Sequence, residues 1–169
     1  LSPQAVYNWL YSSDDPIKKA LRKLMIRPRS RRRSRTKTVT NKGKIVGMTP
    51  ISQRPPGADD RTEFGHWEGD LVIGKGGCSA VATMVERVTR ATVIIKVSSR
   101  KSHTVIAALA RRMRAYYLTS ITWDQGKELA AHAELSKRLG VPVYFADAHS
   151  PWQRGSNENL NGVLRRHLP

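Results

Sequence analysis

Three apolar runs near the middle of the chain decide the fold: WEGDLVI at residues 67–73, SAVATMVERV at residues 79–88 and ATVIIKV at residues 91–97. Each run is rich in the apolar and β-branched residues that favour strands. Only short segments separate one run from the next. Three consecutive strands with short connections predict an antiparallel meander.

Helix and strand patterns alternate after the meander. Residues 103–117 and 127–139 have apolar side chains at helical spacing, and short strand patterns cover residues 120–123 and 141–146. A last helix begins near Ser156. The order of three strands, helix, strand, helix, strand and helix predicts an α/β fold of the RNase H-like type, a mixed five-stranded sheet with helices on both faces.

The N-terminal third of the chain differs in charge from the rest. Residues 1–62 carry 15 basic and 4 acidic side chains, a net charge of +11. Ser2 followed by Pro3 marks the start of one helix, and a second helical stretch covers residues 16–26. We therefore expect a small helical segment over residues 1–26, a flexible basic linker over residues 27–62, and the sheet domain over residues 63–169.

The charge of the whole chain points to a polyanionic partner. Thirty Lys and Arg against 13 Asp and Glu give a net charge of +17, which favours nucleic acid over the alternatives, a ribosomal protein or an anionic membrane surface. Cys78 is the only cysteine, which excludes an internal disulfide framework and a cysteine-based zinc site. No apolar run approaches the ~18 residues of a membrane span, so we expect a cytoplasmic protein without membrane contact. The chain opens at Leu1 in what resembles the middle of a motif, and its last helix runs out of sequence, so we also expect a chain cut short at both ends.

Two aspartates lie where a buried charge needs compensation. Asp70 lies inside the first predicted strand, and Asp124 follows the fourth predicted strand, before the turn residue Gly126. In an RNase H-like sheet these two strands are parallel neighbours, so both carboxylates face one crevice. Taken singly, a strand-end Asp and a turn Asp are the favoured explanations. Two adjacent carboxylates, however, repel each other unless a cation lies between them.

Glu158 supplies a third carboxylate at the start of the last helix. A first-turn Glu is also favoured by the helix dipole. That explanation leaves unexplained the density of Asn157, Asn159 and Asn161, which are poor helix-interior residues with amides suited to ligands. Oxygen ligands match Mg²⁺ or Mn²⁺, and two such ions can promote in-line phosphoryl transfer.

These motifs together resemble those of a known family. They are HWEGD at residues 66–70, DQGKE at residues 124–128 and WQRGSNEN at residues 152–159, with 33 residues between Asp124 and Glu158. The sequence resembles DDE insertion-sequence transposases of the IS-thirty type, within the retroviral-integrase-like group. The resemblance extends over essentially the whole chain.

The resemblance implies a function and a set of site residues. Asp70, Asp124 and Glu158 would bind two Mg²⁺ (or Mn²⁺) ions, cleave DNA at the ends of a mobile element and join the freed strand to target DNA. The partners implied are double-stranded DNA, both the terminal inverted repeats and the target, and further copies of the chain in a homodimer or higher oligomer. Residues 1–26 resemble part of a helix-turn-helix, although a plain packing helix is equally compatible. A bacterial, nucleoid-associated location follows.

DNA contacts are expected from basic and amide side chains near the triad and in the linker, with an ordinary surface position as the alternative for each basic residue near the triad. These residues are Arg31, Arg32, Arg33, Lys127, Arg154, Asn157, Asn161 and Arg165. Glu68 shares strand parity with Asp70 and is the rival metal ligand. Asp147 and His149 lie close enough in sequence to reach the same pocket, and their roles stay open.

Two other functions remain open from the sequence alone. A degenerate or truncated relative would bind DNA without reacting. A nuclease with the same fold would hydrolyse nucleic acid without joining strands.

Overall fold

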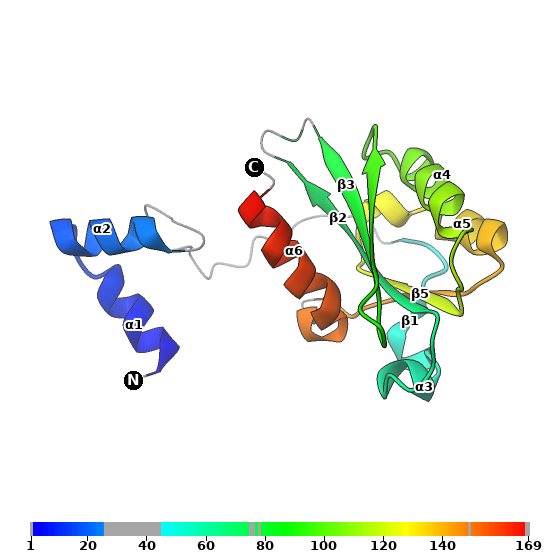
Figure 1. Cartoon of the computed structure of the whole chain (residues 1–169), viewed down its shortest axis with the longest axis horizontal. Coiled ribbons are helices and arrows are strands. Elements are labelled where there is room, and N and C mark those ends of the chain that lie inside the picture. The colour runs from blue at the N-terminus through cyan, green and yellow to red at the C-terminus, as the bar shows by residue number, and fades with distance from the viewer. Residues whose placement is uncertain (1, 26–44, 75–76, 78, 149, 168–169) are drawn as a thin grey trace. The chain divides into compact units, whose positions relative to one another are not determined.

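The computed structural model describes residues 2–25, 45–74, 77, 79–148 and 150–167 of the 169-residue chain. The chain divides into two compact units, Leu1–Asn41 and Lys42–Pro169. Helices α1 and α2 belong to the first unit, and the β-sheet belongs to the second (Figure 1). No helix in these described ranges is long and apolar enough to cross a membrane.

The described part of the first unit contains two short helices, α1 (Pro3–Leu10) and α2 (Pro16–Leu24). Ser2 caps α1 and Asp15 caps α2, and each side chain accepts a hydrogen bond from an amide of the first turn. Such caps satisfy amides that have no partner inside the helix, and a proline fits the first helical position that follows. Both helices predicted for the N-terminal segment are confirmed.

The second unit is built on a six-stranded sheet with the strand order β1-β6-β5-β2-β3-β4. Strands β2, β3 and β4 form an antiparallel meander, β5 runs parallel to β2, and β6 runs parallel to β5. The mixed sheet and its five predicted strands are confirmed. The strands are β1 (Thr49–Pro50), β2 (His66–Ile73), β3 (Ala80–Glu86), β4 (Thr92–Val97), β5 (Ser120–Trp123) and β6 (Val143–Phe145).

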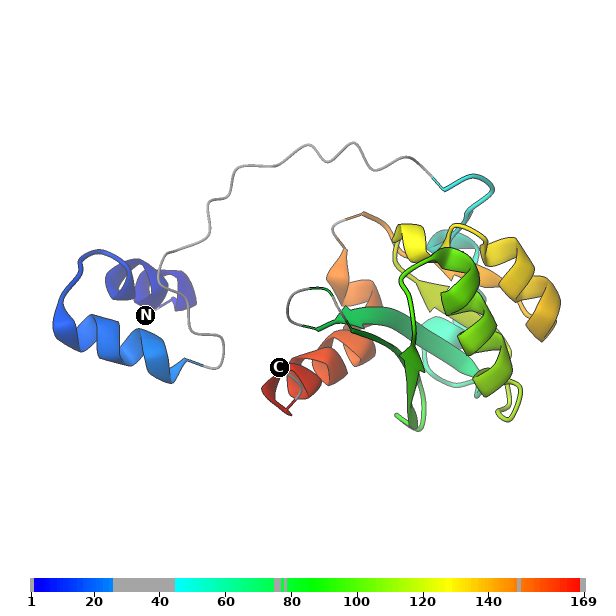
Figure 2. The ribbon, with the colours of Figure 1, turned by 90° about the horizontal axis from the view of Figure 1, so that it is seen from above.

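Helices cover the two faces of this sheet differently. On one face, core residues such as Trp67 and Met84 pack with α4 (Ser102–Met113) and α5 (His132–Leu139). On the other face, α6 (Gly155–His167) lies against β2 and β3 (Figures 1 and 2). Because side chains alternate along a strand, the residues of β2 and β3 that face α6 are those left out of the large apolar core. They carry the polar groups of the site.

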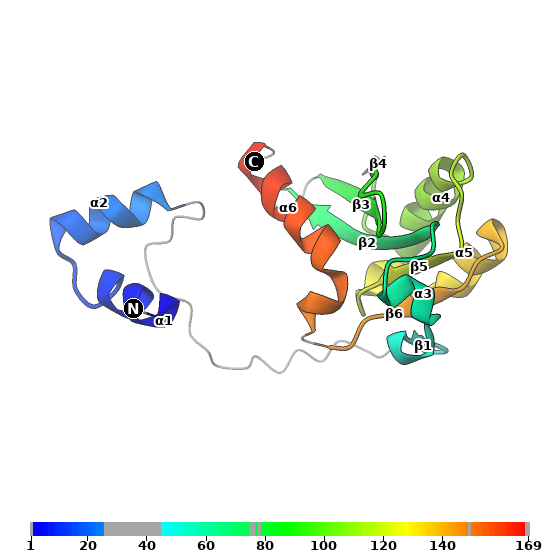
Figure 3. The ribbon, with the colours of Figure 1, turned by 60° about the horizontal axis from the view of Figure 1, so that its bottom comes forward.

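Residues 45–62 fold onto the sheet, although the sequence assigns residues 27–62 to a flexible linker. Strand β1 pairs in parallel with β6 at the sheet edge (Figure 3), and the helix α3 (Pro56–Asp59) follows a 3-10 turn at Ile51–Gln53. Ile51 and Ala58 are buried, and Arg54 donates a hydrogen bond to the Thr122 hydroxyl at 3.0 Å. These few buried groups show no sequence periodicity, which is why the pattern alone indicated a linker.

The rest of the predicted linker, residues 27–44, lies outside the described residues, and Arg31, Arg32 and Arg33 lie there with it. Two further 3-10 turns, Lys127–Leu129 and Pro151–Arg154, lead into α5 and α6.

Candidate active site

Asp70 and Asp124 come from neighbouring parallel strands, as the sequence predicts. In the register of β2 against β5, Glu68 lies beside Thr122. Two residues further along each strand are Asp70 and Asp124, so the pairing carries both carboxylates to the same end of the same two strands. The strand pairing on which the predicted crevice depended is therefore confirmed.

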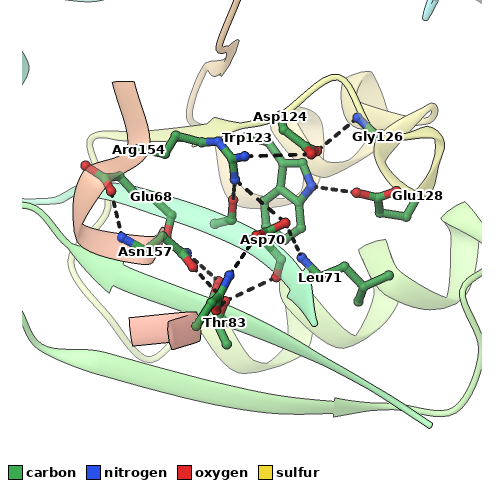
Figure 4. A network of polar contacts seen from close by, with 12 residues as sticks. Glu68, Asp70, Leu71, Thr83, Trp123, Asp124, Gly126, Glu128, Arg154 and Asn157 are labelled. Atoms are coloured by element: carbon green, nitrogen blue, oxygen red, sulfur yellow. Dashed lines mark hydrogen bonds and ion pairs between the residues drawn. The ribbon is translucent and has the colours of Figure 1, made fainter. Parts of the chain in front are cut away.

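A guanidinium group lies between the two carboxylates (Figure 4). Arg154 Nη1 is 3.7 Å from Asp70 Oδ1, and Arg154 Nη2 is 3.7 Å from Asp124 Oδ2. Nη1 also donates a hydrogen bond to the Gly69 carbonyl oxygen at 3.1 Å. Adjacent carboxylates repel each other, and here the positive charge of Arg154 offsets that repulsion. Two carboxylates against one guanidinium leave a net negative charge between the strands, and this charge attracts a cation.

Asp70 has an unusual environment for a carboxylate. Burial raises the pKa of Asp70 to about 6, Arg154 opposes this rise, and the charge of Asp124 adds to it. The Asp70 carboxylate accepts hydrogen bonds from the Leu71 amide at 2.8 Å and from Asn161 Nδ2 at 2.7 Å. Its orientation is therefore set by two donors.

Asp124 is the more accessible of the pair, with 41% of its side chain exposed against 24% for Asp70. The Gly126 amide donates to Asp124 Oδ1 at 2.9 Å, which closes the turn after β5. Beyond the turn, Glu128 accepts a hydrogen bond from Trp123 Nε1 at 3.1 Å. Burial raises the pKa of Glu128, and nearby Asp124 adds to the rise. Glu128 is thus a further carboxylate beside the pair, one that sequence reasoning did not single out.

Two asparagines attach α6 to the sheet beside the aspartates. Asn157 Nδ2 donates to the carbonyl oxygens of Glu68 (2.9 Å) and Thr83 (3.1 Å), and the Thr83 hydroxyl lies within hydrogen-bond distance of the side-chain oxygens of Asn157 and Asn161. Asn157 has no exposed surface, and Asn161 is also buried. Both residues were predicted to contact DNA. Their amide groups bind the protein itself, so in this structure neither presents a free amide on the surface.

Glu68, the rival ligand, lies beneath the start of α6 and is fully buried. One carboxylate oxygen forms an ion pair with Arg87, and the other accepts a hydrogen bond from the Asn157 amide at 3.0 Å. Arg87 also donates to the Ala58 carbonyl oxygen at 2.6 Å. Both oxygens of Glu68 therefore have protein partners, and its place in the structure is that of an anchor for α6.

Glu158 lies on the exposed surface of α6, one residue after the buried Asn157. Among the described residues, no group of three His, Cys, Asp or Glu side chains is arranged to hold a metal ion. The structure thus brings Asp70 and Asp124 together and leaves Glu158 outside their contacts. Lys127 and Arg165 are exposed, as phosphate-binding residues need to be.

The loop before α6 accounts for the remaining candidates. The Asp147 carboxylate accepts a hydrogen bond from Gln153 Nε2 at 2.8 Å, and the Asp147 amide donates to Gln153 Oε1 at 2.7 Å. Asp147 therefore closes this loop. His149 lies outside the described residues.

The donor set of the crevice suits a hard divalent cation. Asp70 and Asp124 offer carboxylate oxygens, the ligands that Mg²⁺ and Mn²⁺ prefer. Arg154 pairs with both carboxylates and would give up these contacts to an ion, and Asp124 is open to solvent. The residues present fit such an ion.

The mixed sheet, with β2 antiparallel to β3 and parallel to β5, has the RNase H-like arrangement, and the two aspartates lie where β2 and β5 run side by side. Residues 60–151 match the integrase core domain, and the chain belongs to this family. The match includes Asp70 and Asp124 and ends before Glu158.

Named relatives agree with the predicted resemblance, which is confirmed. The chain is 39% identical over its whole length to the transposase for insertion sequence element IS1086 of Cupriavidus metallidurans, and 40% identical to transposase InsI for element IS30A of Escherichia coli. It covers 51% and 46% of those proteins, so it spans about half the length of the relatives.

A solved structure supports the fold. The intasome of simian T-cell lymphotropic virus, in complex with PP2A regulatory subunit B56 gamma, contains a chain that superposes with a TM-score of 0.53. The sequence identity is 18%, over 60% of this chain and 38% of the other. The RNase H-like prediction is confirmed by this likeness.

Proposed function

We propose that this chain is the catalytic part of a DDE-type DNA transposase, which cleaves strands at the ends of a mobile element and joins them to target DNA. The observation that carries the proposal is the Asp70–Asp124 pair, held on adjacent parallel strands of an integrase core. Relatives named as transposases match the chain from end to end.

Asp70, Asp124 and Glu158 are assigned as ligands of Mg²⁺ or Mn²⁺, with two ions in the full site. When bound, such ions supply charge stabilisation for in-line phosphoryl transfer. Asp70 and Asp124 provide oxygens from a rigid sheet. Glu158 and Asn161 are three residues apart and therefore neighbours on the surface of α6, and Asn161 binds Asp70. This neighbourhood supports Glu158 as the third ligand.

Double-stranded DNA is the proposed partner, both as element ends and as target, in a dimer or larger assembly on the DNA. The net charge of +17 supports a polyanionic partner. Lys127 and Arg165 are assigned as phosphate-binding residues, which their exposure supports. We place the protein in the bacterial cytoplasm, where its DNA lies.

Nicking of a duplex that carries the terminal repeats of the element tests the proposal. The full chain with Mg²⁺ or Mn²⁺ should nick this duplex, and Glu158→Gln should abolish nicking while DNA affinity stays close to wild type. Glu134→Gln is the matched control, because Glu134 is an exposed carboxylate on α5 that pairs with Arg138. Unchanged nicking by Glu158→Gln would remove Glu158 from the site.

Joining of the cut strand separates this function from its two alternatives. A transposase produces joined products when target DNA is supplied, whereas a nuclease of the same fold yields only cut strands. A DNA-binding remnant yields neither product and still shifts the duplex in a binding assay.

A further inference from the structure

A second pocket lies along the flank of α6 that faces away from Glu158. Its volume is about 530 Å³, and from α6 it is lined by Ser156, Asn159, Leu160 and Val163. On a helix of 3.6 residues per turn, these four side chains share one flank, and Glu158 lies on the opposite flank. The pocket is therefore separate from the crevice of Asp70 and Asp124.

Two arginines give this pocket its charge. Arg61, from the turn after α3, and Arg90, from the turn between β3 and β4, both line it, and Arg90 donates a hydrogen bond to the Ser156 hydroxyl. None of the described residues that line the pocket is acidic. Within the part of the chain that the structure describes, neither arginine has an ion-pair partner. Both side chains are exposed, so two positive charges are open to an anion.

The backbone at both arginines is strained. Among the described residues, Arg61 (φ 58°) and Arg90 (φ 62°) are the two residues other than glycine that have positive φ. A side chain with a Cβ is disfavoured in this left-handed conformation, which glycine adopts freely. The two positions of this kind in the described part of the chain thus line one pocket, and each carries a guanidinium where glycine would fit better. Strain that persists at paired positions points to a function for the side chains.

The remaining walls indicate which kind of anion would fit. Val85 is buried on β3 and forms an apolar wall together with Leu160 and Val163, while Ser156 and Asn159 supply hydroxyl and amide groups. A volume of about 530 Å³ falls within the range of small-molecule sites and exceeds what a bare phosphate needs. A phosphate with its attached sugar and base meets both the charge and the apolar wall.

We propose that this pocket, the Arg61–Arg90 pocket, binds a nucleotide unit of a DNA strand, with its backbone phosphate between the two guanidinium groups. The inference rests on the proposed function, because it takes DNA as the ligand. It assigns α6 two roles: the flank with Glu158 serves the chemistry, and the flank with Ser156 and Asn159 holds DNA.

Glycine substitutions test the pocket without straining the fold. In Arg61→Gly/Arg90→Gly both charges are removed and the left-handed backbone is relaxed, so the melting temperature of the full chain should stay the same or rise. Loss of the single phosphate that both guanidinium groups hold should lower the slope of log Kd against log salt by about 0.9, the contribution of one neutralised phosphate. Between 50 and 200 mM salt, the Kd of the variant should therefore change about three- to fourfold less than that of wild type.

The matched control removes the same charge from the other face of the sheet. Arg111→Ala/Lys137→Ala acts on exposed residues of α4 and α5 and should leave the slope close to wild type. A second variant, Arg61→Asn/Arg90→Asn, should reproduce the glycine result, because asparagine also tolerates positive φ. The proposal is overturned if the pocket variants have the same salt slope as wild type. It is also overturned if the control variant loses as much slope as the pocket variants do.

Two duplexes identify the source of the bound strand. A loss of affinity on an unrelated duplex and on an element-end duplex supports binding of any DNA phosphate, and a loss on the element-end duplex alone supports binding of that end. Nicking by the same preparations separates the two proposals. A chain that never nicks yet shows the slope change contradicts only the transposase function, and a chain that nicks with no slope change contradicts only the pocket.

Discussion

The buried ion pair of Glu68 and Arg87 fixes the start of α6, and its removal gives a measurable test of how the helix is held. Glu68 has no exposed surface, and the Arg87 side chain is 7% exposed. Burial lowers the pKa of Arg87, the charge of Arg54 adds to that effect, and Glu68 opposes it. Glu68 therefore stabilises the charged form of Arg87, which is the form that arginine keeps in proteins.

Glu68→Gln keeps the shape of the side chain and removes only its charge. The Arg87 guanidinium then stays buried without a counter-ion, which costs about 3–5 kcal/mol of unfolding free energy. In Glu68→Gln/Arg87→Gln neither charge remains. The hydrogen bonds to the Asn157 amide and the Ala58 carbonyl oxygen are weakened, at about 1 kcal/mol each, so the double variant should lose about 2 kcal/mol.

Urea unfolding followed by circular dichroism at pH 7 measures the unfolding free energies of wild type, Glu68→Gln, Arg87→Gln and the double variant, which together form a double-mutant cycle. The double variant should be more stable than Glu68→Gln alone, and hydrogen exchange of the Asn157 amide should quicken in the single variant. Glu134→Gln, in the exposed pair with Arg138 on α5, should cost less than about 1 kcal/mol. Additive costs for the two single changes, or a loss below about 1 kcal/mol for Glu68→Gln, would refute the anchor.

Two further predictions concern Asp70 and Gly69. Because the pKa of Asp70 is raised, the folded state favours the protonated acid. The stability that this proton contributes is lost as pH rises from about 4 through about 6. The shift from 3.8 to about 6 corresponds to at most about 3 kcal/mol of unfolding free energy. Asp70→Asn does not titrate, so its urea unfolding free energy relative to wild type should rise between pH 4 and pH 7, and a constant difference would contradict the pKa. Gly69→Ala would place a methyl group in the Trp123 ring and should cost about 1–3 kcal/mol. A methyl group at Gly155 meets no neighbour, so Gly155→Ala should stabilise the folded chain by about 0.4–1 kcal/mol. Gly69→Ala should therefore melt at a lower temperature than Gly155→Ala. Similar melting temperatures for the two variants would show that the Gly69 site can relax.

Most of the fold could be predicted from local patterns. Apolar, β-branched runs identified the meander, period-3.6 spacing identified α4, and the order of elements made β2 and β5 neighbours. The sequence did not reveal β1 or α3, because two strand residues and one helical turn are too short to show a period. Their placement depends on contacts with distant residues, such as that of Arg54 with Thr122.

The site divides in the same way. Residue type and local motifs predicted Asp70, Asp124 and Glu158 as the carboxylates of the site, and the structure brings Asp70 and Asp124 together. Which groups face them was decided by how α6 crosses the sheet. That crossing placed Arg154 between the two aspartates and turned Asn157 and Asn161 inward, and no local pattern encodes such a crossing.

The sequence by itself determined the class of fold and the basic character, and it predicted the carboxylates of the site, since each follows from composition or from short local motifs. Only the tertiary structure decided that Glu68 is an anchor and that Arg61 and Arg90 line one pocket. Residues of each group are at least 19 positions apart in the chain, as Glu68 is from Arg87, and meet only because the strands and α6 fix their register. Hydrogen bonding and burial of a charge depend on that register, which sequence periodicity does not specify.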